Sequence, residues 1–445
     1  MSFFDADKVV LPYIAGYVKG YLLKALEHGI RNGSLHLTIH NGEEYVFGQH
    51  ATKQSGADIH VKNDNFWLRI FYGYDLGFAE AYMHGDFETT SLKNILNLWL
   101  DNRSHLVDLG SPLSRLSSAI SALTLRLTGQ SLSNAKLNVV AAYDYDNDLF
   151  KAFLSEDMMY SCALWPDELG GVRGDLTKGP FPGDLEAAQL YKVHHVLKKA
   201  RVRRGDRLLE FGSGWGTMAI EAAKLGCTVD TLTLSIQQKS EAEERIRKAG
   251  LKSRITVHLL DYRNLPPSFE KAFDAFVAVE MVEHVGLKYH EQFFQILNWA
   301  LKSDRAAVVI TATTQPEWRY STLQAIDYAR KYQWPNAFCP APTPFCASAM
   351  TAAPGAFALE SIEDHGHHYP RTLREWGRRF QTNWNSISSE LIKNHPELTE
   401  GDNLGILKRK WEYMYVYAEI GFAKAYTSCH CFTFVRPENV VTSCH

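Results

Sequence analysis

The feature that most constrains the fold of this chain is an apolar run that leads directly into closely spaced glycines. Residues 208–216 read LLEFGSGWG, and a helical pattern follows from Met218 to Leu225. Glycine lets the backbone turn sharply and pass close to a ligand, and the first turn of a helix offers unpaired N–H groups. The segment therefore predicts a strand, a tight turn and a helix that together bind a nucleotide-like ligand.

Strands and helices alternate around this turn, which is typical of a largely parallel sheet covered by helices on both faces. The strands are predicted at residues 207–211, 228–234, 255–260, 275–279, 306–312 and 429–435. The helices are predicted at residues 218–225, 237–249, 359–380 and 404–426. An α/β fold follows from this order.

A smaller α+β domain is predicted before this region, over residues 1–135. Its expected elements are a helix at 8–31, a hairpin of 35–39 with 45–47 around Asn41-Gly42, a strand at 66–71, and helices from Gly77 and at 92–100. Residues 136–445 form the second predicted domain, in which a lid-like segment covers about residues 315–400.

Charge and composition exclude several classes of protein. The 445 residues carry 47 Lys and Arg against 50 Asp and Glu, so nucleic acid is not an expected partner. Acidic residues in the opening MSFFDADKVV argue against a secretory signal, and no run of 18 apolar residues occurs. We expect a cytoplasmic protein whose seven cysteines are thiols.

Two groups of metal-binding residue types occur, but neither has the spacing of a zinc site. One comprises Cys429, Cys431 and Cys444 with His430 and His445, and the other is the run of histidines at 365, 367 and 368. Alternation along a strand would place His430 on the face opposite to the two neighbouring cysteines. No metal is therefore expected.

The spacing of the glycines separates two classes of ligand. Gly212, Gly214 and Gly216 follow the pattern G-x-G-x-G, whereas the dinucleotide-binding fingerprint is G-x-G-x-x-G. This difference disfavours a nicotinamide cofactor and points to S-adenosylmethionine (SAM).

Seven short motifs in one order resemble those of the cyclopropane-fatty-acid synthases and mycolic-acid methyltransferases. They are Tyr143-Asp144 with Asn147-Asp148, MYSCA at 159–163, LEAAQ at 185–189, EFGSGWG at 210–216, TLSIQQ at 233–238, DYR at 261–263 and EHVG at 283–286. The resemblance implies a SAM-dependent C-methyltransferase on a seven-stranded Rossmann-like sheet, with the smaller N-terminal α+β domain helping to present the substrate.

The same resemblance implies which residues hold SAM. They are Tyr160, Ser161, Glu210, Gly212, Gly214, Gly216, Thr233, Ser235, Gln238, Asp261 and Tyr262. The chemistry of these side chains is consistent with their assignment, since Asp261 can accept from the adenine amino group and polar groups at 233–238 can hold ribose hydroxyls.

The expected reaction follows from the electronics of an alkene. A carbon–carbon double bond has no acidic proton, so its π electrons must attack the sulfonium methyl group and leave a carbocation. That cation requires a dry apolar site, aromatic faces and a base that removes a proton afterwards. Trp165 and Tyr320 lie beside the family motifs and are the candidate aromatic residues.

The resemblance to bacterial cyclopropane synthases implies that the base is a bound bicarbonate, held by a Cys, a Glu, a His and a Tyr. The matching residues, predicted here to be catalytic, are Cys162, Glu283, Thr311 and Tyr369. Thr311 replaces the histidine and can donate a hydrogen bond but cannot carry charge. Ala142 replaces the histidine that usually precedes Tyr-Asp. The use of bicarbonate is therefore left open.

The sequence leaves three functions to be compared. The first is methyl or methylene transfer to an unsaturated fatty acyl or lipid chain. The second is C-methylation of a polyene or isoprenoid natural product in which the cation then cyclises, and the third is a non-catalytic lipid- or SAM-binding protein. Peripheral membrane contact and a homo-oligomer are also left open.

Overall fold

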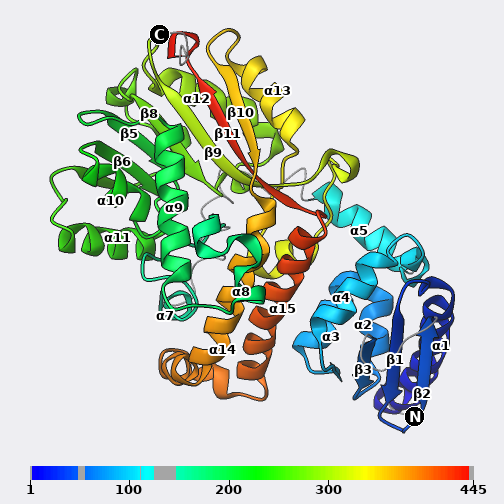
Figure 1. Ribbon diagram of the computed structural model, residues 1–445. Coiled ribbons are helices and arrows are strands. Elements are labelled where there is room, and N and C mark those ends of the chain that lie inside the picture. Colours follow the sequence, from blue (N-terminus) through cyan, green and yellow to red (C-terminus); the bar gives the residue numbers. More distant parts are fainter. Residues whose placement is uncertain (1–2, 49–55, 111, 125–146, 440–445) are drawn as a thin grey trace. The chain divides into compact units, whose positions relative to one another are not determined.

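The computed structural model describes residues 3–48, 56–110, 112–124 and 147–439, and Figure 1 shows its helices and strands. The contacts between residues divide the chain into two compact units. Unit 1 comprises Met1–Leu125, Ala325–Gln333 and Leu391–Ile420, and unit 2 comprises Arg126–Gln324, Trp334–Glu390 and Gly421–His445. The predicted domain boundary near residue 135 and the predicted departure at Ala142 lie outside the described residues.

Unit 1 is an α+β unit whose four-stranded sheet has the order β2-β1-β3-β4. Its strands are β1 (Ser34–Ile39), β2 (Glu44–Gly48), β3 (Ala57–Val61) and β4 (Phe87–Glu88). Its N-terminal helices are α1 (Phe3–Gly29), α2 (Asn65–Gly73), α3 (Asp75–Met83), α4 (Leu92–Asp101) and α5 (Pro112–Thr124). The predicted hairpin is confirmed, because β1 and β2 pair in antiparallel register.

Two predictions of secondary structure are wrong. Residues 66–71, predicted as a strand, belong to helix α2, in which Phe66, Trp67 and Ile70 are buried. A short continuous apolar run does not distinguish a buried helix from a buried strand. Residues 359–364, predicted as the start of a helix, form strand β10 (Ala358–Asp364), and the helix begins only at Tyr369.

Unit 2 is built on the seven-stranded sheet that was predicted, with the order β10-β11-β9-β8-β5-β6-β7. The strands are β5 (Arg207–Phe211), β6 (Thr228–Thr233), β7 (Ile255–Leu259), β8 (Ala275–Val279), β9 (Ala307–Thr314), β10 and β11 (Ser428–Val435). Strands β5 to β9 are parallel to one another where they pair, and β11 is antiparallel to both of its neighbours.

Helices connect and flank these strands. They are α7 (Asn147–Lys151), α8 (Gly174–Thr177), α9 (Asp184–Lys199), α10 (Thr217–Lys224), α11 (Ile236–Lys248), α12 (His290–Ala300), α13 (Pro342–Ala352), α14 (Tyr369–Asn394) and α15 (Asn403–Ala423). The last parts of α14 and most of α15 belong to unit 1. Among the described helices, none combines the length and the apolar character needed to cross a membrane.

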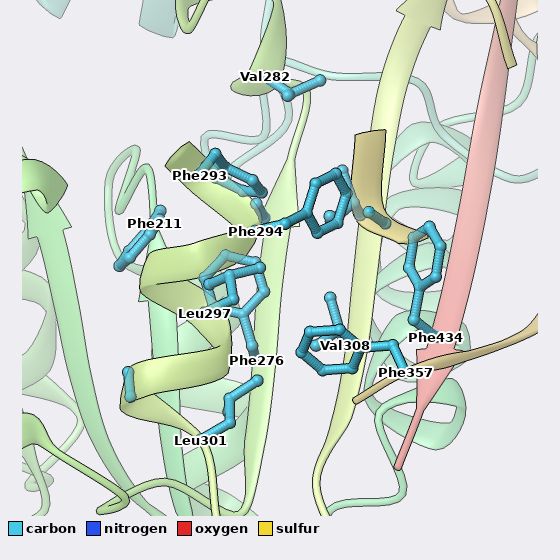
Figure 2. Close-up of a cluster of buried hydrophobic side chains, with 14 of the residues drawn as sticks. Phe211, Phe276, Val282, Phe293, Phe294, Leu297, Leu301, Val308, Phe357 and Phe434 are labelled. Atoms are coloured by element: carbon cyan, nitrogen blue, oxygen red, sulfur yellow. The ribbon is translucent and has the colours of Figure 1, made fainter. Parts of the chain in front are cut away.

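The sheet of unit 2 separates two apolar clusters, and alternate residues of each strand point to opposite clusters. Val308 and Ile310 of β9 join one cluster with α12 and α13, whereas Val309 joins the other with α9, α10 and α11. Figure 2 shows the first cluster, in which aromatic rings from several elements gather. The result is a three-layer arrangement in which both faces of the sheet are buried.

We expect Phe276→Ala to destabilise unit 2 strongly. The Phe276 ring lies 4.8 Å from that of Phe211 and 5.9 Å from that of Phe293, between ring centroids. Removing a buried phenylalanine ring leaves a cavity, so the free energy of unfolding should fall by about 3–5 kcal/mol in urea titration. The matched control is Phe181→Ala, since Phe181 is 53% exposed; it should change this free energy by less than about 0.5 kcal/mol.

Candidate active site

A cavity lies at the carboxyl ends of β5, β6 and β8, the position at which parallel α/β sheets bind ligands. Most of the predicted SAM residues line it, namely Tyr160, Ser161, Glu210, Gly212, Gly214, Thr233, Gln238, Asp261 and Tyr262. Gly216 and Ser235 do not line the cavity; they are the N-caps of helices α10 and α11.

The glycine turn has a backbone that other residues adopt only with strain. Gly212 and Gly214 have φ angles of 88° and 48°, in the left-handed region. A Cβ atom at Gly212 would also lie 3.3 Å from the side chain of Met281. The turn therefore needs glycine for its conformation, and its small size leaves the backbone open to the cavity.

Glu210 gives the cavity a buried acidic group. Its Oε2 has no hydrogen-bond partner among the described residues, and burial raises the pKa of this carboxyl to about 8. A buried carboxyl without a partner is costly unless a ligand compensates it. The methionine part of SAM carries an ammonium group, whose positive charge and N–H donors would compensate the unpartnered oxygen of Glu210. This cavity therefore fits SAM.

The residues at the ends of β6 and β7 hold one another in place. Thr233 Oγ1 donates to Gln238 Oε1 at 2.8 Å, and Ser235 Oγ accepts from the Gln238 N–H at 3.2 Å. The Asp261 carboxylate is bound by Arg263, whose Nε lies 2.8 Å from Oδ1. These contacts fix the loops, while Thr233, Gln238 and Asp261 still face the cavity.

A polar cluster beside the cavity is centred on Glu280, which the sequence analysis did not select. Glu280 Oε1 accepts from the backbone N–H of Cys162 at 2.7 Å, and Oε2 accepts from the Tyr369 hydroxyl at 2.5 Å. The thiol of Cys429 lies 3.9 Å from Oε1. The structure thus brings the predicted Cys162 and Tyr369 together, but around a different carboxylate, which itself lines the cavity.

Cys162 enters this cluster through its main chain. Its thiol contacts the carbonyl oxygens of Ala163 and His365 at 3.4 and 3.7 Å, and burial raises its pKa. A thiol with a raised pKa stays protonated and is a weak nucleophile. The group of Cys162 that contacts Glu280 is its backbone N–H.

Glu283 lies next to this cluster and differs from Glu280 in its surroundings. Its Oε1 accepts from the Thr313 N–H at 2.5 Å, while its Oε2 has no partner among the described residues. Burial, followed by the nearby charge of Glu280, raises the pKa of Glu283 to about 8. Near neutral pH, Glu283 is therefore mostly an uncharged carboxylic acid.

Thr311 supports Glu280 through the backbone. Its carbonyl oxygen and its Oγ1 both accept from the Glu280 N–H, at 2.8 and 3.2 Å. Of the four residues predicted to be catalytic, Cys162, Tyr369 and Thr311 contact Glu280, and Glu283 is its close neighbour through space.

The predicted aromatic residues lie apart from the cavity lining. Trp165 is buried, its Nε1 donates to Thr372 Oγ1, and the Arg371 guanidinium lies 4.0 Å from its ring centroid. Tyr320 lies near Phe338, with ring centroids 6.3 Å apart. The face of Trp165 is thus occupied by a cation of the protein itself.

Two tryptophan rings lie beside Tyr160, which lines the cavity. The ring centroids of Trp376 and Trp334 lie 5.2 and 6.3 Å from that of Tyr160. Trp376 also lies 6.2 Å from Tyr369, the donor to Glu280. Sequence reasoning missed both tryptophans, because they follow no motif and come together only in the folded chain.

A separate group of metal-binding residue types lies at the edge of the sheet. The group comprises His195, Glu363 and His365. Each offers one ligand atom, and these three atoms lie within 4.8 Å of one another. The Glu363 carboxylate also forms a salt bridge with Lys199. The lysine neutralises the carboxylate, so these contacts are accounted for as a hydrogen-bonded cluster that joins α9 to β10.

Comparison with known sequences finds clear relatives. Residues 130–398 match the family described as mycolic acid cyclopropane synthetase. The chain is 30% identical over 367 residues to tuberculostearic acid methyltransferase of Mycobacterium tuberculosis. The aligned part covers 81% of this chain and 79% of that protein. The chain is also 30% identical over 345 residues to cyclopropane-fatty-acyl-phospholipid synthase of Escherichia coli, covering 75% of this chain and 78% of that one.

Solved structures share the fold. A cyclopropane synthase from Mycobacterium tuberculosis matches with a TM-score of 0.56 and 21% identity, over 68% of this chain and 98% of that one. Coclaurine N-methyltransferase, bound to N-methylheliamine and S-adenosylhomocysteine, matches with a TM-score of 0.59 and 16% identity, over 80% and 98% of the two chains.

We expect Glu210→Gln to weaken binding of S-adenosylhomocysteine about 10- to 100-fold, because a charge-assisted hydrogen bond contributes about 1.5–3 kcal/mol. With a pKa of about 8, Glu210 is mostly protonated near neutral pH in the free protein, and an ammonium group favours its ionised form. Ligand binding should therefore release a proton, which isothermal titration calorimetry in two buffers of different ionisation enthalpy measures.

The proton release should be absent in Glu210→Gln and present in the control Glu243→Gln, since Glu243 is exposed on α11. Affinity and proton release that are the same in Glu210→Gln as in the natural protein would contradict the assignment of Glu210 to the ligand.

Proposed function

Because the chain belongs to the mycolic acid cyclopropane synthetase family and is a SAM-dependent methyltransferase, we propose that it methylates a carbon–carbon double bond of an unsaturated lipid acyl chain. The relatives named above act on fatty acids or fatty acyl phospholipids according to their names. The observation that carries the proposal is that the aromatic ring of Tyr160 and the hydrogen-bonded carboxyl group of Glu280 both line the SAM cavity.

SAM supplies an electrophilic methyl group when it is bound. Glu210 and the glycine turn at 212–216 hold its amino-acid end, and Tyr160 and Ser161 line the opposite wall. Ser161 Oγ accepts from the buried Lys192 ammonium at 2.5 Å, so the loop that carries Tyr160 is fixed to helix α9. These residues orient the ligand and exclude water from the reacting carbon.

The alkene must react as a nucleophile, and the cation that forms on its chain needs protection from water. The ring of Tyr160 lines the cavity and provides a π face that stabilises positive charge, and Trp334 and Trp376 pack beside that ring. Oxygen or nitrogen methylation would need no such arrangement, because those nucleophiles have lone pairs and pass through no carbocation. The site chemistry therefore favours carbon as the methyl acceptor.

The N-terminal α+β unit is proposed to present the acyl chain. The product can be a cyclopropane, a methyl-branched chain or a methylene chain, and the test below distinguishes them.

The test is incubation of the protein with SAM carrying a labelled methyl group and vesicles of phospholipid with monounsaturated acyl chains. We expect label in the acyl fraction after the lipids are hydrolysed, and gas chromatography with mass spectrometry identifies the product. Vesicles of the saturated phospholipid with the same headgroup are the matched control and should acquire no label. Label in the headgroup, or equal label from both lipids, would contradict the proposal.

The alternative substrates are outcomes of the same assay. If label enters a polyene or isoprenoid alkene while the phospholipids stay unlabelled, the substrate is a natural product of that kind and not a lipid acyl chain. Binding of SAM without transfer to any of these substrates would favour a non-catalytic binding protein.

A further inference from the structure

We propose that Glu280 is the proton acceptor of this reaction, so that the base is a carboxylate of the chain itself and no separately bound anion is required. The inference rests on the proposed function, because the carbocation that methyl transfer to an alkene leaves must lose a proton to give a stable product. It is carried by the contacts of Glu280, by its backbone conformation and by the charges around it.

The contacts of Glu280 form a complete anion-binding site that is filled by its own carboxylate. The described donors come from three segments far apart in the sequence, namely the Cys162 N–H, the Tyr369 hydroxyl and the Cys429 thiol. A carboxylate has about four lone-pair sites, so these three donors leave one lone pair free. Since Glu280 also lines the cavity, its carboxyl group lies beside the space that a ligand would enter.

The backbone of Glu280 has an unfavourable conformation, which its surroundings must stabilise. Glu280 has a φ angle of 48°, in the left-handed region that favours glycine. Such a conformation is strained in a residue with a side chain and persists where the surroundings hold it, often at functional sites. Thr311 holds it here, by accepting twice from the Glu280 N–H. Thr311 is therefore a positioning residue for Glu280.

The surrounding charges favour a negative charge on Glu280 rather than on its neighbour. Glu283 is the more easily protonated partner because it lacks comparable donors and its pKa is raised to about 8. Burial raises the pKa of Glu280 above its ordinary value, and the hydrogen bonds from Tyr369 and Cys162 and the charge of Lys192 oppose that rise. Burial also keeps the pKa of the Tyr369 hydroxyl well above its ordinary value, so Tyr369 remains a donor.

The proposed step balances in atoms and electrons. The π pair of the alkene forms a bond to the methyl carbon, and the pair of the broken sulfur–carbon bond stays on sulfur, which gives S-adenosylhomocysteine. A C–H bond then breaks and its proton passes to Glu280. If that bond is on the carbon next to the cationic carbon, its electron pair forms a new double bond. If it is on the transferred methyl group, its electron pair closes the three-membered ring. The proton returns to solvent after product release.

The first test compares two substitutions of Glu280. Glu280→Gln keeps the volume and removes the base, so kcat should fall at least about 100-fold, the usual contribution of a general base. Binding of S-adenosylhomocysteine should change less than about threefold. Glu280→Gly removes the side chain and suits the left-handed backbone, so it leaves the donors of Cys162 and Tyr369 facing an open space.

Small carboxylate-like anions should restore turnover only in the glycine variant. We expect formate or bicarbonate to raise the kcat of Glu280→Gly at least about tenfold, and to leave Glu280→Gln unchanged because the amide fills the same space. The natural protein should keep its turnover in buffer freed of carbon dioxide. Glu270→Gln, which alters an exposed carboxylate in the same unit, is the control for substitution itself and should match the natural protein.

A binding measurement without SAM or lipid gives an independent readout. Carbon-13 NMR of labelled bicarbonate should show binding to Glu280→Gly and none to the natural protein. The inference is overturned if Glu280→Gln retains turnover within about threefold of the natural protein, or if the natural protein binds bicarbonate and needs it for turnover. Absence of transfer by the natural protein to any unsaturated lipid would instead remove the proposed function.

Discussion

The half-buried carboxyl group of Glu280, at the end of strand β8, is the constraint on which the site depends. A carboxylate out of contact with water is unfavourable unless donors surround it. The donors to Glu280 come from the loop before helix η3 (Asp167–Leu169), from the start of α14 and from β11, so these segments must pack together for the charge to be tolerated. Satisfying one carboxylate thus assembles a site from elements that are remote in sequence.

The sheet gives this charge its place beside the methyl donor. Parallel strands β5, β6 and β8 end at one edge, and the loops that follow them carry the glycine turn, Thr233 and Glu280. Two carboxyl groups at this edge differ in their surroundings. The Oε2 atom of Glu210 has no partner among the described residues and suits the cationic end of a ligand, whereas Glu280 is supplied with donors and suits a proton.

Much of this fold could be predicted from the sequence, because the glycine turn and the alternation of strands and helices are local signals. Strands β5 and β8 coincide with their predicted ranges. The prediction failed at residues 66–71, where an apolar run has no clear period, and at β10, whose side chains alternate little in burial. In both places the packing partners decide the structure, and the local pattern does not contain them.

The SAM cavity was also predictable, but its acid–base chemistry was not. The motif at 283–286 directed attention to Glu283, although residues 275–280 read AFVAVE and place a carboxylate at the end of a buried strand. That position is a usable signal, since ligands bind at the carboxyl ends of parallel strands. The cluster also depends on two backbone features, namely the Cys162 N–H donor and the left-handed φ angle of Glu280. Backbone features of this kind cannot be read from residue types, so the sequence alone could not reveal the complete cluster.

The most direct test of this account is a crystal structure of the protein with S-adenosylhomocysteine, grown in the presence of bicarbonate. The account predicts that the ligand lies against Glu210 and the glycine turn, and that the carboxylate of Glu280 receives the Cys162 N–H and the Tyr369 hydroxyl. Electron density for a separate planar anion at those two donors, with the Glu280 side chain turned away from them, would contradict it.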